Sequence, residues 1–120
     1  MKILIVDDSK AMRLIVIRTL RQAGFGDHQL EEATNGAEAL AAVRAHKHDV
    51  VLSDWNMPEM NGLQLLESLR AEGYRGRFAF ITSESTDEMK KKAQDAGASV
   101  FVTKPFTAEV FQALLGPLLK

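Results

Sequence analysis

The 120-residue sequence contains no cysteine and carries almost no excess charge of either sign. The absence of cysteine excludes disulfide bridges, thiolate metal sites and a cysteine nucleophile. With 16 acidic and 15 basic residues, the formal net charge is −1, so the chain lacks the positive excess that general nucleic-acid and membrane-surface binders need. We therefore expect no direct binding to nucleic acid.

Long apolar runs are also missing. The first run, residues 3–6, ends at Asp7 and Asp8 and is too short for a membrane span or the core of a signal peptide. We therefore expect a cytoplasmic protein without membrane insertion. Hydrophobic residues nevertheless make up 46% of the chain, and its length is usual for one domain, so we expect a single folded domain over residues 1–120.

Short apolar runs alternate with longer segments of helical periodicity. The runs are rich in β-branched and aromatic residues, which is typical of strands buried on both faces of a parallel sheet, and a more polar run at 30–33 predicts an edge strand. Five such alternations predict a three-layer, doubly wound α/β domain with right-handed crossovers. The buried strands are expected at 3–6, 50–52, 78–81 and 100–102, and the helices at 9–23, 36–45, 62–71, 86–96 and 107 to about 115. Gly116-Pro117 is expected to break or kink the last helix.

Chemically active side chains follow four of the predicted strands. Asp7 and Asp8 follow the first strand, Asp54 the third, Thr82 the fourth and Lys104 the fifth. Because sites in open parallel sheets form at the carboxyl ends of strands, these groups should converge. Three close carboxylates repel one another unless a hard cation such as Mg²⁺ binds between them. A carboxylate can also act as a nucleophile and form an aspartyl phosphate, with lysine and hydroxyl groups binding the transferred oxygens.

Four stretches resemble the motifs of response-regulator receiver domains, particularly the stand-alone chemotaxis type. They are residues 3–9 (ILIVDDS), 32–40 (EATNGAEAL), 54–62 (DWNMPEMNG) and 103–106 (TKPF), and together they cover nearly the whole length in order. The resemblance implies a flavodoxin-like (βα)5 fold with strand order 2-1-3-4-5. It also implies a two-component signalling protein that switches partner binding. Apart from its own phosphoryl transfer and slow autodephosphorylation, such a protein is not an enzyme.

The resemblance assigns the metal-binding and acceptor roles. Asp54 is the implied phosphoacceptor, and the implied donor is a phosphohistidine on a histidine kinase or histidine phosphotransfer protein. Mg²⁺ is the implied cofactor, held by Asp8 directly, by Asp7 partly through water, by Asp54 and by the backbone carbonyl of Asn56.

The resemblance also implies a switch and a rate control. Thr82 and Lys104 are expected to contact the phosphoryl oxygens after transfer, and Phe101 is expected to turn inward as Thr82 moves. Relatives with a tyrosine at the position of Phe101 carry a hydroxyl that this chain lacks. Asn56 and Glu84 stand where family members tune the attack of water on the phosphoaspartate.

Two surfaces are candidates for partner binding. The resemblance implies an output surface for a downstream protein target on the fourth helix, fifth strand and fifth helix. On the first helix, the spacing predicts that Ile15 lies on the buried face, whereas Leu14 and Ile17 point outward among Arg13 and other basic residues. Such an apolar patch with a basic rim predicts a docking site for the phosphoryl donor.

The three histidines, His28, His46 and His48, are expected on the surface, because their spacing does not place them on one face as metal ligands. Trp55 follows the acceptor directly and is expected near the site.

Two other function classes compete with the receiver interpretation. A haloacid dehalogenase-type phosphatase also uses Mg²⁺, aspartate and lysine, but it places its nucleophile after the first strand in an Asp-x-Asp pattern. A flavodoxin-like cofactor binder needs a hydroxyl- and glycine-rich loop after the first strand, where this chain has Asp7 and Asp8. Within the receiver interpretation, a chemotaxis output protein, a phosphorelay shuttle and a receiver cut from a longer regulator remain alternatives.

Overall fold

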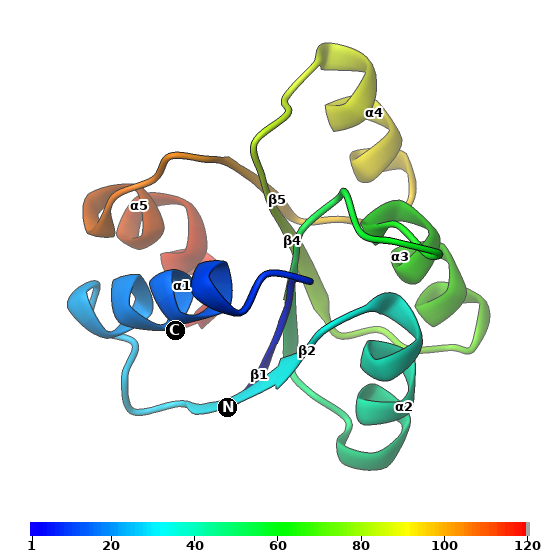
Figure 1. Cartoon of the computed structure of the whole chain (residues 1–120), viewed down its shortest axis with the longest axis horizontal. Helices are drawn as coiled ribbons and strands as arrows, with labels where there is room; N and C mark the ends of the chain where they lie inside the picture. Colours follow the sequence, from blue (N-terminus) through cyan, green and yellow to red (C-terminus); the bar gives the residue numbers. More distant parts are fainter. Residues whose placement is uncertain (120) are drawn as a thin grey trace.

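The computed structural model describes residues 1–119, which form five parallel strands alternating with five helices (Figure 1). The strands pair in the order β2-β1-β3-β4-β5, which confirms the predicted doubly wound fold. The strands are β1 (Lys2–Val6), β2 (Gln29–Ala33), β3 (Val50–Ser53), β4 (Arg77–Thr82) and β5 (Val100–Thr103). The helices are α1 (Lys10–Gln22), α2 (Gly36–His46), α3 (Gly62–Ala71), α4 (Asp87–Asp95) and α5 (Ala108–Leu119).

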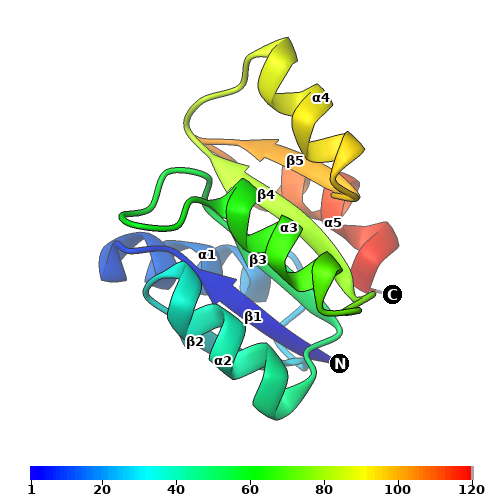
Figure 2. The same ribbon diagram turned by 90° about the vertical axis from the view of Figure 1, so that its right-hand side faces the viewer.

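The helices cover both faces of the sheet. Helices α1 and α5 lie on one face, and α2, α3 and α4 lie on the other (Figures 1 and 2). Alternate residues of each strand therefore enter different cores: Ile3 and Ile5 pack with α1 and α5, whereas Leu4 and Val6 pack with α2 and α3. This two-sided burial explains why the central strands read as unbroken apolar runs.

Side chains from the loops cap the starts of four helices. Ser9, Asn35, Asn61 and Thr86 each accept a hydrogen bond from a backbone N–H in the first turn of α1, α2, α3 and α4. Each such cap is worth about 1 kcal/mol. The caps fix the point at which each chain segment turns from the sheet into its helix.

The last helix does not end where the sequence predicted. Helix α5 continues through Gly116 and Pro117 to Leu119, so the expected end near residue 115 is wrong. Pro117 removes only one backbone donor in the final turn. Continuation buries Leu118 and Leu119 in the same core as Phe111, and this burial outweighs the lost hydrogen bond.

The buried face of α1 agrees with the prediction at Val16, Thr19 and Leu20 but differs from it at two apolar positions. Ile17 is 9% exposed and packs in the core, whereas Ile15 is 44% exposed, so both expectations for these side chains are wrong. Leu14 is 48% exposed, as predicted. The buried stripe runs through positions 13, 16, 17 and 20, an i, i+3, i+4, i+7 pattern that also meets α5. Arg13 is therefore buried rather than part of an exposed rim.

The amino edge of the sheet is tied down by side chains of α3 and its following loop. Arg70 donates to the backbone carbonyls of Tyr74, Gly76 and Gly97, and the Tyr74 hydroxyl donates to the carbonyl of His48. His48 itself is 1% exposed, so the expectation that all three histidines lie on the surface is wrong. Across residues 1–119, no helix has the length and apolar character needed to cross a membrane.

Candidate functional site

Three carboxylates meet at the carboxyl edge of the sheet. Asp7 and Asp8 follow β1, and Asp54 follows β3, the neighbouring strand. The Asp54 N–H donates to the Val6 carbonyl at 2.9 Å, which extends the parallel pairing past the strand ends. Each aspartate offers one oxygen, and these oxygens lie within 4.8 Å of one another. The sequence-based expectation that these side chains converge is confirmed.

Lys104 reaches this cluster from the end of β5, an edge strand that lies two strands away from β3. Its ammonium lies 3.1 Å from Oδ2 of Asp7 and 3.6 Å from Oδ2 of Asp54. One lysine balances one of three carboxylates, so the cluster keeps a deficit of positive charge. A hard divalent cation such as Mg²⁺ prefers oxygen ligands, and its charge would offset the remaining negative charge of the cluster.

The surroundings of Asp54 change the pKa of its carboxyl group. Burial raises its pKa above the ordinary value, the Lys104 ammonium acts against this shift, and the Asp7 carboxylate adds to it. The Asp54 Oδ1 atom accepts a hydrogen bond of 2.7 Å from the Trp55 N–H, whereas Oδ2 faces Lys104. The backbone of Trp55 thus holds Oδ1 of Asp54 in place, and the Lys104 ammonium can offset negative charge on Oδ2.

Thr82 stands at the end of β4 with a hydroxyl that is fully buried. Its side chain is 0% exposed, and within residues 1–119 the hydroxyl makes no well-aligned hydrogen bond, although it lies close enough to the Asp54 carboxylate to act against the rise in the pKa of that group. A buried polar group without a partner is unfavourable by about 1–3 kcal/mol. The hydroxyl can therefore gain a hydrogen bond if an acceptor enters the site beside it.

Two exposed polar side chains lie together in the loops that follow β3 and β4. The Asn56 amide donates to the Glu84 carboxylate at 3.3 Å, which links the loops that follow β3 and β4. Both side chains are exposed, so water can reach them. The contribution of the Asn56 carbonyl to a metal site stays a prediction.

Two residues that support the site were not identified from the sequence. Buried Arg13 donates to the Asp7 carbonyl at 2.7 Å and to the Glu32 carboxylate at 2.9 Å. The spacing of positions 13, 16, 17 and 20 allows a buried stripe that contains Arg13, but periodicity alone does not select this stripe over its neighbour. Gly62 starts α3, and its N–H donates to the Trp55 carbonyl at 2.8 Å. A Cβ at Gly62 would overlap the Asp54 carbonyl oxygen, so glycine lets α3 approach the acceptor loop closely.

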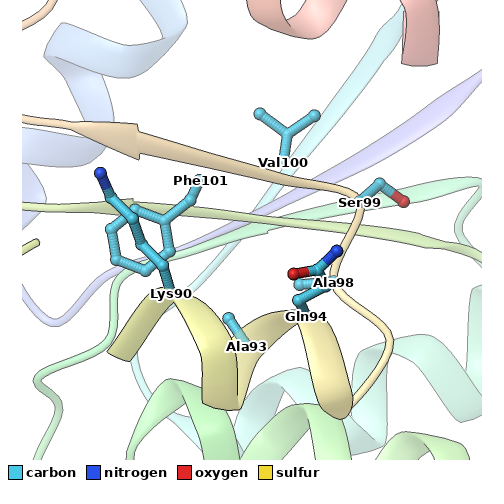
Figure 3. A pocket seen from close by; sticks show the side chains of 7 residues that line it. All are labelled: Lys90, Ala93, Gln94, Ala98, Ser99, Val100 and Phe101. Atoms are coloured by element: carbon cyan, nitrogen blue, oxygen red, sulfur yellow. The ribbon is translucent and has the colours of Figure 1, made fainter. Parts of the chain in front are cut away.

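Phe101 lies half-buried on β5, on the same side of the sheet as Phe80 and Thr82. Its ring centroid lies 5.9 Å from Phe80 and 6.3 Å from Trp55, which follows the acceptor and is near the site as predicted. Phe101 also lines a hollow of about 310 Å³ between β5 and α4, where Lys90 extends past its ring (Figure 3). An aromatic chain of contacts thus joins the acceptor loop to the surface beside α4.

Comparisons with known proteins agree with this geometry. The family model for the response regulator receiver domain matches residues 3–115. The chain is 39% identical over 122 residues to chemotaxis protein CheY-3 of Vibrio cholerae. The alignment covers 100% of this chain and 92% of that protein. The chain is also 39% identical over 114 residues to chemotaxis protein CheY of Pseudomonas aeruginosa. That alignment covers 93% of this chain and 90% of that protein.

Solved structures show the same likeness. The crystal form of Vibrio cholerae chemotaxis protein CheY4 obtained at low pH superposes with a TM-score of 0.86 at 34% identity, covering 98% of each chain. The signal receiver domain of the putative response regulator NarL from Mycobacterium tuberculosis superposes with a TM-score of 0.83 at 30% identity, covering 98% of this chain and 94% of that one.

Proposed function

The chain belongs to the response regulator receiver domain family, and from this premise we propose that Asp54 accepts a phosphoryl group from a phosphohistidine with the help of Mg²⁺. The family makes the protein a two-component signalling receiver and not a conventional enzyme. The observation that carries the proposal is the meeting of three carboxylates and the Lys104 ammonium at one edge of the sheet. We further propose that one receiver domain spans residues 1–120.

In the proposed reaction, a carboxylate oxygen of Asp54 forms a bond to phosphorus while the bond from phosphorus to the donor's imidazole nitrogen breaks. The electron pair of the breaking bond stays on that nitrogen. Asp8, Asp7 and the Asn56 carbonyl are the proposed Mg²⁺ ligands beside Asp54. The bound ion supplies positive charge that offsets the charges of the acceptor and of the incoming phosphoryl oxygens.

The proposed switch starts at Thr82 and Lys104. A phosphoryl group adds about two negative charges and three strong acceptors. The unpartnered Thr82 hydroxyl and the Lys104 ammonium are the proposed donors to those acceptors. Movement of Thr82 leaves space next to Phe101, whose half-buried ring we propose turns inward and changes the surface of α4, β5 and α5.

Slow autodephosphorylation completes the proposed cycle. Water must reach the phosphoaspartate in line with the oxygen that leaves. Asn56, two residues after the acceptor, contacts Glu84 from the next loop, so we propose that this pair controls that access.

Partner binding is proposed on two surfaces. A histidine kinase or histidine phosphotransfer protein is the proposed donor, and it docks on α1, where Leu14 and Ile15 form the exposed apolar pair in place of Leu14 and Ile17. The downstream protein target binds α4, β5 and α5. Relatives named as chemotaxis proteins favour a chemotaxis output, with a phosphorelay shuttle or a receiver of a longer regulator as alternatives.

The test uses acetyl phosphate and Mg²⁺ with intact protein. We expect mass spectrometry to find one phosphoryl group per chain, located on Asp54, and Trp55 emission to change when Mg²⁺ or beryllofluoride binds. Asp54→Asn should give no adduct, whereas Asp49→Asn, at the other end of β3, should be phosphorylated normally. An adduct that persists in Asp54→Asn would contradict the proposal. A haloacid dehalogenase-type phosphatase would instead turn over phosphate esters, and a flavodoxin-like binder would purify with flavin.

A further inference from the structure

A second cluster of potential metal ligands lies away from the carboxylates. Glu31 comes from the edge strand β2, His46 is the last residue of α2, and His48 precedes β3. Nδ1 of His46 lies 3.0 Å from one Glu31 oxygen, and Nε2 of His48 lies 3.2 Å from the other. One ligand atom from each residue lies within 4.8 Å of the other two. A strand, a helix end and a loop residue thus bring two imidazole nitrogens and a carboxylate close together.

The backbone around this cluster is held in place. Lys47 adopts a left-handed conformation with φ of 49°, and this turn lets His46 and His48 approach the same carboxylate. The His48 carbonyl accepts a hydrogen bond from the Tyr74 hydroxyl. On the other side, Asp49 pairs with Lys2 at 2.8 Å through its backbone N–H and again through its carboxylate. The two histidines therefore need little rearrangement to bind a ligand together.

His48 is the most informative member of the cluster. Its side chain is buried, and within residues 1–119 neither ring nitrogen makes a hydrogen bond. Although Nε2 lies 3.2 Å from the Glu31 carboxylate, the two are not aligned for a hydrogen bond. An unpartnered buried imidazole nitrogen keeps its desolvation penalty. An ion placed between Nε2 and the carboxylate would use both groups.

We propose that Glu31, His46 and His48 bind one divalent transition-metal ion, with Zn²⁺ as the best chemical match. Imidazole nitrogens suit Zn²⁺ and its neighbours in the transition series, whereas Mg²⁺ prefers oxygen ligands only. Two histidines and one glutamate are a known Zn²⁺ ligand set that leaves a fourth position for water. The three aspartates at the opposite edge offer oxygen alone, so the two clusters select different ions.

Such an ion would connect three segments of the chain. It would join the edge strand β2 to the end of α2 and to the segment that enters β3. Because these groups are brought together only in the folded chain, the ion would bind the folded state and raise the melting temperature. This effect does not depend on phosphorylation of Asp54, so the site can exist whether or not the proposed function holds.

The experiment measures Zn²⁺ binding by equilibrium dialysis of the intact chain in a large excess of Mg²⁺, which keeps the aspartate cluster occupied. We expect one Zn²⁺ per chain and a higher melting temperature with Zn²⁺. Co²⁺ at the same site should give visible absorption bands typical of nitrogen and oxygen ligands. Glu31→Gln and His46→Gln, both at solvent-accessible positions, should each weaken binding by at least about 10-fold, since even outer-shell partners of metal ligands contribute about 10- to 100-fold.

His28→Gln is the matched control, because His28 lies near the N-terminal amine and outside the cluster. It should leave Zn²⁺ affinity unchanged. Near-ultraviolet circular dichroism of each variant separates lost ligation from lost folding. The proposal is overturned if Zn²⁺ does not bind in the presence of Mg²⁺, or if folded Glu31→Gln and His46→Gln bind as the wild type does. It is also overturned if Asp54→Asn, rather than the cluster variants, removes the binding.

Discussion

The two edges of the parallel sheet carry clusters of ionisable side chains that are assembled differently. At the carboxyl edge, Asp7, Asp54 and Lys104 each follow a strand directly, so the strand order alone brings them together. At the amino edge, Glu31 lies within a strand, His46 ends a helix and His48 follows a left-handed turn. The first cluster depends on topology, whereas the second depends on local conformation and on how α2 packs beside β2.

This difference decides what could be predicted from the sequence. The strand-end positions of Asp7, Asp8, Asp54 and Lys104 were predicted because a parallel sheet has few possible arrangements once its strands are located. The histidine cluster was missed because spacing in the sequence does not reveal the conformation of Lys47. A site is thus easiest to predict from sequence when the fold class alone brings its residues together. It is hardest to predict when the conformation of a single residue determines whether the side chains meet.

The largest expected effect is at the carboxyl edge. Asp54→Asn removes the proposed nucleophile, so phosphorylation by acetyl phosphate should fall below detection by mass spectrometry. The same variant should keep the Zn²⁺-dependent rise in melting temperature, because β3 separates the two clusters. Loss of both properties would show that the two edges are not independent.

The next largest effect concerns the approach of α3 to the acceptor loop. In Gly62→Ala, the new methyl group overlaps the Asp54 carbonyl oxygen and the Phe80 ring. We expect a loss of about 1–3 kcal/mol in the free energy of unfolding, measured with urea, together with slower phosphorylation. Gly26→Ala is the control, because its methyl group meets only the Arg21 side chain closely, at 3.3 Å from Cγ. Equal stability of the two variants would contradict the argument.

A smaller effect is expected at the amino edge. Tyr74→Phe removes the hydrogen bond to the His48 carbonyl, so the free energy of unfolding should fall by about 1 kcal/mol. Zn²⁺ affinity should fall as well if this bond helps to position His48. Unchanged stability and unchanged affinity together would show that the tether does not matter.

The same residue predicts a pH dependence. Burial raises the pKa of Tyr74 to about 12, above its ordinary value near 10. The folded state therefore holds the phenolic proton more tightly than the unfolded state, and this contribution to stability is complete below pH 10 and is lost as the pH rises toward 12. Tyr74 is the only tyrosine, so its ultraviolet absorbance reports its ionisation directly. A midpoint near pH 10 in the folded protein would contradict the burial argument.

The smallest effect on stability is expected on α1. Leu14→Asp should leave the free energy of unfolding within about 0.5 kcal/mol of wild type, because Leu14 is exposed. It should nevertheless slow phosphotransfer from a histidine phosphotransfer donor by about 10-fold, equivalent to about 1.4 kcal/mol, while acetyl phosphate still reacts normally. Ile17→Asp is the contrasting variant, because it places a charge in the core and should destabilise the fold. Equal rates for Leu14→Asp and wild type with the protein donor would remove the docking proposal.

Side-chain packing explains the remaining differences between expectation and structure. A helix whose apolar residues are as dense as those of α1 can present two neighbouring stripes, and sequence periodicity does not choose between them. In the structure Arg13 enters the interior and donates to the Asp7 carbonyl, and the same orientation of the helix buries Ile17 and exposes Ile15. At the other end of the chain, Leu118 and Leu119 continue α5 because the core accepts them.

The two ends of helix α4 are held differently: Thr86 caps the first turn from within the same loop, whereas a side chain of another helix binds just beyond the last turn. Arg70 binds the Gly97 carbonyl just beyond its last turn, whereas its first turn follows the exposed segment 83–86 that leads from Thr82. Ala93 is the only buried residue of the helix. If Thr82 moves as proposed, we expect the start of α4 to move more than its end, so that the helix rotates about Gly97 instead of sliding as a block.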